Sequence, residues 1–185
     1  AIATVMPVEK LRWVGLSHFE ADECGGLNEL LAVAPKAEPL CSRVAAMVSV
    51  DDFADRPARS LADGEVLRLG TTRVRWLDTP HLPLGWDCGY LVEETTSTLL
   101  CGDLFTQPGA DNPPVTEGDI LGPSEAMRGG MDYFAHSQGS RPLFEKVADT
   151  QPRTLACMHG SAWSGDGKAL LLELANALDA KRVAA

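Results

Sequence analysis

The segment Ser17-His-Phe-Glu-Ala-Asp-Glu-Cys-Gly-Gly26 lies between an apolar stretch at 11–17 and a stretch with helical spacing of apolar residues at 25–35. These patterns predict a strand that ends at the segment and a helix that begins after it. An extended segment would place His18, Glu20 and Asp22 on one side, at steps of about 7 Å. Imidazole and carboxylate groups together suit iron, manganese or zinc. An exposed acidic loop with an incidental histidine explains the three residues equally well.

Three further polar residues follow apolar stretches at predicted strand ends, namely His81, Asp103 and His159. An unpaired charge at the edge of a core is costly, so such residues need partners. With the first segment, four strand ends would deliver three histidines and several carboxylates to one place. This set predicts a site for two metal ions in which one carboxylate bridges both.

Strand and helix patterns alternate along the chain. We expect strands at 65–69, 72–77, 90–93, 97–101 and 154–158, and helices at 43–50, 124–136, 141–149 and 168–180. The stretch 106–122 is rich in Pro, Gly, Asp and Asn and predicts a long loop. Without an internal repeat or a long linker, the pattern predicts a single α/β (α+β) domain over 1–185.

Composition narrows the classes of partner. The chain has 185 residues, of which 45% are hydrophobic and 23% are charged, and its formal net charge is −10. Such an acidic balance argues against nucleic acid and anionic membranes as partners. No apolar run approaches the roughly 20 residues that a membrane-spanning helix needs.

The five cysteines are an odd number and contain no Cys-x-x-Cys pair. This pattern fits neither a disulfide framework nor a four-thiolate metal site. Because most of them stand among apolar neighbours, we expect buried, reduced thiols. Reduced thiols predict a cytoplasmic location.

The ordered set His18-x-Glu20-x-Asp22, His81, Gly102-Asp103 and His159-Gly160 resembles the metallo-β-lactamase superfamily. Within it, Glu20 and the runs Cys-Gly-Asp-Leu-Phe and Met-His-Gly resemble the diiron domain of flavodiiron proteins and oxygen-binding diiron proteins. Hydrolases of the superfamily usually have His where Glu20 stands. The resemblance implies an αββα sandwich. That fold begins with strands upstream of its first metal motif, so we expect an N-terminally incomplete sandwich here.

The resemblance also implies six ligands for two iron ions. They are His18, Glu20 and His81 at the first iron, Asp22 and His159 at the second, and Asp103 as a bridge. Family members usually have His directly after the Asp of the first motif, where this sequence has Glu23. Either Glu23 ligates as a carboxylate, or the second position is weaker, open or absent. Manganese or zinc is the alternative to iron.

Function follows from this resemblance as an expectation. A diiron protein of this kind would bind, and reduce or sense, dioxygen or nitric oxide. The sequence contains no FMN-binding domain, which favours oxygen binding or sensing over fast reduction unless a separate electron donor takes part. Whether the protein is an enzyme is left open, and we expect no catalytic residues beyond the metal ligands. A head-to-tail homodimer is common among the resembling proteins and is expected here.

Other interpretations remain. A metal-dependent hydrolase of esters, thioesters or phosphoesters is the main alternative, because the fold supports it. Two aromatic residues, Trp86 and Tyr133, are candidates for lining the pocket, although core packing or a surface position would also explain them. The stretch 160–168 lacks the Gly-Lys-Ser/Thr ending of a phosphate loop, which argues against nucleotide binding.

Overall fold

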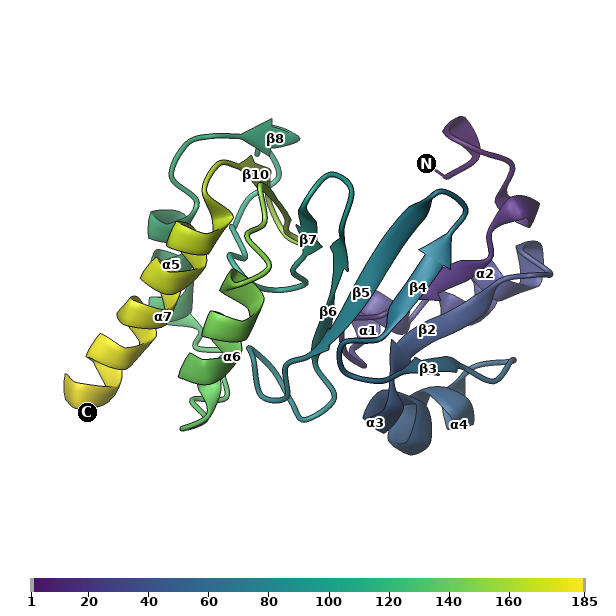
Figure 1. Ribbon diagram of the computed structural model, residues 1–185, viewed down its shortest axis with the longest axis horizontal. Coiled ribbons are helices and arrows are strands. Elements are labelled where there is room, and N and C mark those ends of the chain that lie inside the picture. The colour runs from purple at the N-terminus through teal and green to yellow at the C-terminus, as the bar shows by residue number, and fades with distance from the viewer. Residues whose placement is uncertain (1, 185) are drawn as a thin grey trace.

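The structure is a computed structural model that describes residues 2–184, with side chains described over 2–180. Its strands form two sheets (Figure 1). The first sheet consists of three parallel strands, β1 (Trp13–Gly15), β2 (Glu38–Ser42) and β3 (Arg59–Leu61). The second sheet has seven strands in the order β4 (Val66–Leu69), β5 (Thr72–Asp78), β6 (Gly89–Glu93), β7 (Thr98–Leu100), β9 (Thr154–Ala156), β10 (Ala162–Ser164) and β8 (Val115–Thr116).

The pairings in the second sheet are mixed. Strands β4 to β7 form an antiparallel meander, whereas β7 pairs with β9 in parallel. Strand β10 is antiparallel to β9 and parallel to β8. The parallel β7–β9 pair brings the ends of two distant segments of the chain to the same edge, which is where the predicted metal ligands follow.

Helices accompany both sheets. Near the first sheet are α1 (Ala21–Cys24), α2 (Leu27–Val33), α3 (Arg43–Ala45), the π-helical turn η3 (Ala46–Val50) and α4 (Asp51–Phe53). On the side of the second sheet are α5 (Leu121–Gly130), α6 (Ser140–Ala148) and α7 (Gly167–Ala184). Two 3-10 turns, η1 (Ile2–Thr4) and η2 (Val8–Lys10), precede β1. The alternation confirms the predicted α/β class.

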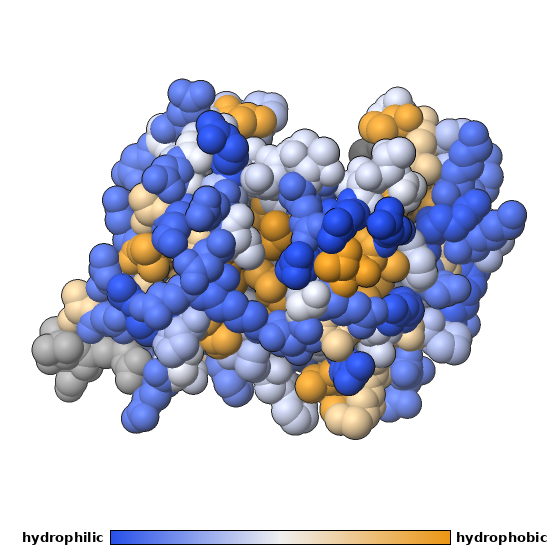
Figure 2. All heavy atoms as spheres, viewed as in Figure 1, coloured by the Kyte–Doolittle hydropathy of each residue, from blue (hydrophilic) through white to orange (hydrophobic). Residues whose placement is uncertain are grey.

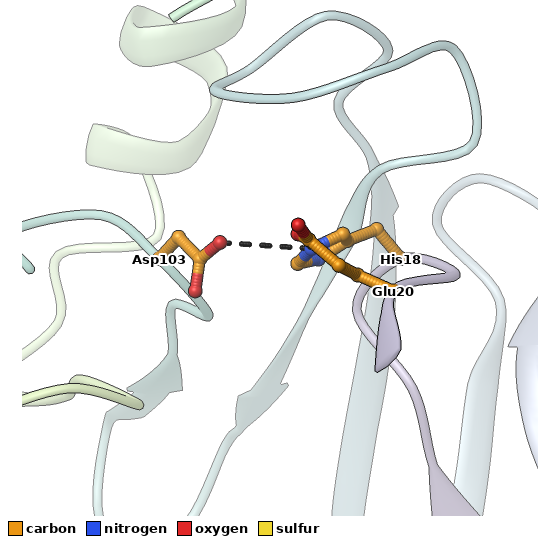
Figure 3. Close-up of side chains that lie close together, drawn as sticks. All are labelled: His18, Glu20 and Asp103. Carbon is orange, nitrogen blue, oxygen red and sulfur yellow. Dashed lines mark hydrogen bonds and ion pairs between the residues drawn. The ribbon is translucent and has the colours of Figure 1, made fainter. Parts of the chain in front are cut away.

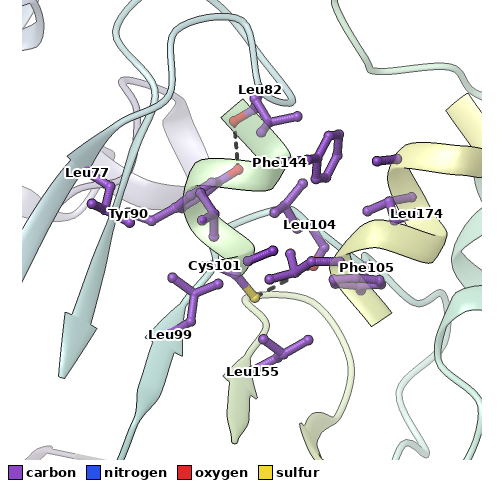
Figure 4. Close-up of a cluster of buried hydrophobic side chains, with 14 of the residues drawn as sticks. Leu77, Leu82, Tyr90, Leu99, Cys101, Leu104, Phe105, Phe144, Leu155 and Leu174 are labelled. Carbon is purple, nitrogen blue, oxygen red and sulfur yellow. Dashed lines mark hydrogen bonds between the residues drawn. The ribbon is translucent and has the colours of Figure 1, made fainter. Parts of the chain in front are cut away.

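The apolar core is divided among three clusters. The largest packs the second sheet against α6 and α7, with Leu99, Phe144 and Leu174 fully buried (Figure 4). A second cluster, around Leu31 and Cys41, joins α2 to the first sheet. A third, smaller cluster lies where the two sheets meet. Removing this apolar surface from water makes the largest favourable contribution to the stability of the fold.

Several predicted elements need correction. The helix expected at 124–136 is wrong in its bounds, because α5 begins at Leu121 and ends at Gly130, so that Ser124 lies buried inside it instead of capping it. Strands β2 and β3 were not predicted. Four of the five residues of β2 are buried, so the strand has none of the alternation that marks a half-exposed strand.

A groove of about 440 Å³ opens between the two sheets. Its walls are mostly apolar and include Trp13, Leu40, Trp76, Leu91, Leu100 and Met158. Hydrophilic side chains cover most of the face shown in Figure 2, with apolar ones exposed near its middle. Among the described residues, no helix is both long and apolar enough to cross a membrane. All five cysteines are free, as predicted, and only Cys157 is partly exposed.

One ion pair ties α6 to the second sheet. Lys146 Nζ lies 2.5 Å from Asp63 Oδ1 and 2.9 Å from the carbonyl oxygen of Asp78. Burial raises the pKa of Asp63, but the bonds from Lys146 and from the Asp78 N–H outweigh it and hold that pKa below its ordinary value of 3.8. The pair therefore stabilises the fold above that value, and its contribution is lost as pH falls through the lowered pKa.

We expect Lys146→Met to reveal this pH dependence. Because Asp63 is half exposed, the ionic part should be about 0.5 kcal/mol. Urea unfolding of both proteins near neutral pH and near pH 3 measures it. The stability difference between wild type and variant should shrink at the lower pH, and a difference that stays constant would mean that the ionic part is negligible.

Candidate metal centre

The segment after β1 changes conformation at Ala21. Glu20 is extended, with φ −140° and ψ 158°, and α1 begins at the next residue. The expectation that His18, Glu20 and Asp22 alternate along one extended segment is therefore wrong beyond Glu20. Carboxylates are favoured in the first turn of a helix, where they face its positive end. Because the chain turns into α1 here, Glu20 points toward the His18 ring, Asp22 toward His159 and Glu23 back toward the start of the segment.

Glu20 points toward His18, and Asp103 lies across from both (Figure 3). The Nε2 atom of His18 is 2.8 Å from Glu20 Oε2 and 3.6 Å from Asp103 Oδ2. One ligand atom from each of the three residues lies within 4.8 Å of the others. His18 and Asp103 are buried, whereas the Glu20 side chain is 53% exposed. The cluster is thus anchored in the protein and open on one side.

Asp22 points toward His159, which follows β9. The Nε2 atom of His159 is 3.1 Å from Asp22 Oδ2 and 3.5 Å from Asp103 Oδ1. Both partners of Asp103 are therefore histidines, each facing a different oxygen of the same carboxylate. Asp103 stands between two His–carboxylate pairs, one from His18 and Glu20 and the other from His159 and Asp22.

The burial of Asp103 and its unpaired oxygen are consistent with a metal ion bound by these residues. Its Oδ1 atom is buried and has no hydrogen-bond partner among the residues that the structure describes. Burial is the main reason why the pKa of Asp103 is raised, although His18 and His159 pull it down. A buried carboxylate oxygen without a partner is costly, and a bound cation would supply one. Two imidazoles and three carboxylates suit iron, manganese or zinc.

Glu23 points back to the start of the segment. Its side chain is only 2% exposed, and it accepts hydrogen bonds from the Ser17 N–H at 2.7 Å, the Ser17 hydroxyl and the His18 N–H at 3.2 Å. Both of its oxygens are used in this way. The structure therefore places Glu23 as an acceptor that holds the strand-to-helix turn, beside the cluster of ligands rather than in it.

Ser17 connects Glu23 to His18. The Ser17 hydroxyl lies 2.9 Å from His18 Nδ1 and donates its proton to Glu23. Ser17 Oγ is then an acceptor toward the ring, so Nδ1 carries a proton and Nε2 is the ring atom that faces Glu20 and Asp103. Burial lowers the pKa of His18, but the nearby carboxylates outweigh burial and raise it.

Three other candidates have different surroundings. His81 is exposed in the loop after β5, has φ +66°, and is outside the cluster of ligands. Its role as a ligand stays a prediction. Trp86, in the same loop, is 60% exposed. The Tyr133 hydroxyl donates to the backbone carbonyl of Asp103 at 3.2 Å, so this residue supports the turn that carries Asp103.

The sequence analysis missed Asp87. It is buried, and its Oδ2 accepts a hydrogen bond at 3.0 Å from the N–H of Phe19, the residue between His18 and Glu20. The contact joins residues 68 positions apart. Asp87 stands three residues before the predicted strand at 90–93, and that position is the only local signal that could have indicated it.

Gly102 allows β7 to approach Ser17. It has φ +48°, and a Cβ atom there would lie 2.6 Å from Ser17 Oγ. We expect Gly102→Ala to lower the free energy of unfolding by about 1–2 kcal/mol more than Gly70→Ala. Gly70 also has a positive φ, +66°, but its Cβ would meet nothing within 4 Å, so that variant measures backbone strain alone. Equal losses in urea unfolding would show that Ser17 accommodates the methyl group.

Comparison with known proteins adds evidence on the fold. The sequence matches no protein-family model and no curated protein. Among solved structures, it is similar to rubredoxin:oxygen oxidoreductase from Desulfovibrio gigas, with a TM-score of 0.79 and 21% identity over 96% of this chain and 46% of that one. It is likewise similar to the Flv1 flavodiiron core from Synechocystis, with a TM-score of 0.81 and 21% identity over 96% of this chain and 45% of that one.

A third similar structure is the peroxy diiron species of a chemotaxis sensor, with a TM-score of 0.77 and 19% identity over 94% of this chain and 72% of that one. This chain spans about half the length of the first two proteins. At such identities the likeness concerns the fold, and it confirms the fold that the motifs predicted. The chain has the metallo-β-lactamase-like fold of the diiron core of flavodiiron proteins.

Proposed function

We propose that this protein is a non-haem diiron protein that binds dioxygen or nitric oxide, with residues 1–185 forming one domain. The observation that carries the proposal is the placement of Asp103, whose two oxygens face two different histidines. His18, Glu20 and Asp103 would hold one iron. Asp22, His159 and Asp103 would hold the other.

Iron held by these residues would supply electrons and open coordination positions for a small diatomic ligand. The residues around the site define its access. His18 and Asp103 are buried and fix the inner side, whereas Glu20, Asp22 and His159 are each between 40% and 53% exposed. A small ligand can therefore approach from the solvent side without a movement of the sheets.

The names of similar structures support this class of substrate. One is an oxygen oxidoreductase, and another is a chemotaxis sensor with a peroxy diiron centre. The chain aligns with less than half of the oxidoreductase. A separate electron donor for any reduction is part of the proposal. A homodimer and a cytoplasmic location remain part of the proposal.

Metal analysis combined with absorption spectra tests the proposal. The purified chain, loaded with Fe(II) without oxygen, should hold about two irons and develop a near-ultraviolet charge-transfer band when air is admitted. Zinc alone, with no oxygen-dependent band, would contradict it. Turnover of a generic ester or thioester that a chelator abolishes would favour the hydrolase alternative instead.

A further inference from the structure

Two cysteines lie opposite each other just beyond the parallel pair β7–β9. The register pairs Leu100 with Ala156, so the next residues in line are Cys101 and Cys157. The Cys101 N–H donates to the Ala156 carbonyl at 3.1 Å, which continues the ladder to this point. Neighbouring strands are about 4.8 Å apart, and the Cα atoms of disulfide-bonded cysteines are usually about 4.4–6.8 Å apart. The backbone spacing therefore suits a disulfide.

The two sulfur atoms already face each other. Their separation is 3.8 Å, and both side chains lie on the face that packs against the large core (Figure 4 shows Cys101 there). The other cysteines have different surroundings. The Cys24 and Cys88 thiols donate to backbone carbonyls at 2.9 Å, closer than the carbonyls near Cys101 and Cys157 at 3.9–4.0 Å, and Cys41 is buried in the cluster beside the first sheet.

Only one member of the cysteine pair is accessible to solvent. Cys101 is fully buried, whereas Cys157 is partly exposed and lines the groove between the sheets. The groove walls next to it, Leu100 and Met158, are apolar and partly exposed. Cys157 is therefore the member of the pair that a small neutral oxidant meets first, and the oxidised sulfur then has the Cys101 thiol as its neighbour.

We propose that Cys101 and Cys157 are a redox-active pair that closes to a disulfide when the protein meets a hydroperoxide. The Cys157 thiolate attacks the peroxide, its sulfur takes one oxygen, and the O–O bond breaks to release water or an alcohol. The sulfur of Cys101 then attacks the sulfenic acid of Cys157, and the hydroxyl group leaves as water. In total, two thiols lose two hydrogens, and the peroxide gains them.

The pair adjoins the candidate metal centre. Cys101 stands two residues before Asp103, and Cys157 stands two residues before His159. Closing the disulfide brings the sulfurs from 3.8 Å to about 2.05 Å, and the adjustment falls on the ends of β7 and β9. An effect on metal binding follows only if the proposed function is correct, whereas disulfide formation does not depend on it.

Thiol counting in the metal-free protein tests the proposal directly. After treatment with hydrogen peroxide and denaturation, accessible thiols should fall from five to three and return to five with dithiothreitol. Trypsin and a glutamyl endopeptidase together should release a linked peptide pair. Cleavage at Glu93 and Glu94 separates Cys88 from Cys101, so the mass identifies the bonded cysteine.

Variants give matched controls. Cys157→Ser should keep all four of its thiols under the same treatment, apart from a slow loss that does not depend on Cys101. Cys41→Ala should fall from four thiols to two, because the pair is intact. Since the wild-type peptide map needs no variant, poor folding of Cys157→Ser would not prevent the test.

Three results would overturn the proposal. They are five remaining thiols in the wild type, links that involve other cysteines, and oxidation of Cys157 to a sulfinic acid without a bond to Cys101. Iron content of the oxidised and reduced forms is measured separately. A disulfide that forms without changing iron content would support the pair and remove only its link to the metal centre.

Discussion

The substitution Asp103→Asn should reduce bound iron from about two ions per chain to less than one. The amide has no negative charge, and one of its two oxygens is replaced by an NH₂ group that cannot ligate. Since each oxygen of Asp103 faces a different histidine, the loss affects both halves of the centre. Metal analysis after anaerobic loading with Fe(II) measures it.

The same variant has an opposite effect on the metal-free fold. In the wild type, Asp103 Oδ1 is buried without a hydrogen-bond partner among the described residues, and burial raises the pKa of this carboxyl. A neutral amide is less costly to bury, so the metal-free variant should be as stable as the wild type or up to about 2 kcal/mol more stable. Asp119→Asn, the same change in an exposed loop, is the control. Two irons retained in Asp103→Asn would refute the bridging role.

Glu23→Ala should lower the free energy of unfolding by about 3 kcal/mol while iron content is largely retained. The substitution leaves the N–H groups of Ser17 and His18 and the Ser17 hydroxyl without their buried acceptor. It also removes the group that orients Ser17 toward the His18 ring. Urea unfolding of the metal-free protein and metal analysis of the loaded protein measure the two effects.

Two further variants sharpen this test. Glu23→Gln keeps one acceptor oxygen but turns an NH₂ group toward a donor, so its stability should lie between those of Glu23→Ala and wild type. Glu29→Ala, an exposed glutamate in the first turn of α2, should change stability by less than about 0.5 kcal/mol. Loss of one iron from Glu23→Ala, with unchanged stability, would show that Glu23 is a metal ligand.

Local sequence patterns were sufficient to predict most strands of the second sheet. Alternation of polar and apolar residues predicted β5, and short stretches rich in apolar residues predicted β4, β6, β7 and β9. Strand β2 shows no such alternation, since it is buried along nearly all its length. Its place depends on pairing with β1 and β3 on either side.

The candidate metal centre was also predictable only in part. Ligand chemistry at strand ends identified His18, Glu20, Asp22, Asp103 and His159, and the structure brings these five together in two pairs around Asp103. The direction of each carboxylate was not predictable, because it depends on the chain entering α1 at Ala21. His81, identified by the same chemistry, lies in an exposed loop outside the cluster.

By itself, the sequence determined which donor types are present, in what order, and which motifs they resemble. Those properties can be found in the sequence because they depend only on single residues and on short distances along the chain. Only the tertiary structure decided that Asp103 faces two histidines, that Glu23 supports Ser17 and His18, and that two cysteines meet beside the centre. Each of the contacts at Asp103 and between the cysteines joins segments far apart in the chain. The pairing of β7 with β9 brings Asp103 near His159 and Cys101 near Cys157, whereas the packing of the two sheets brings Asp103 near His18.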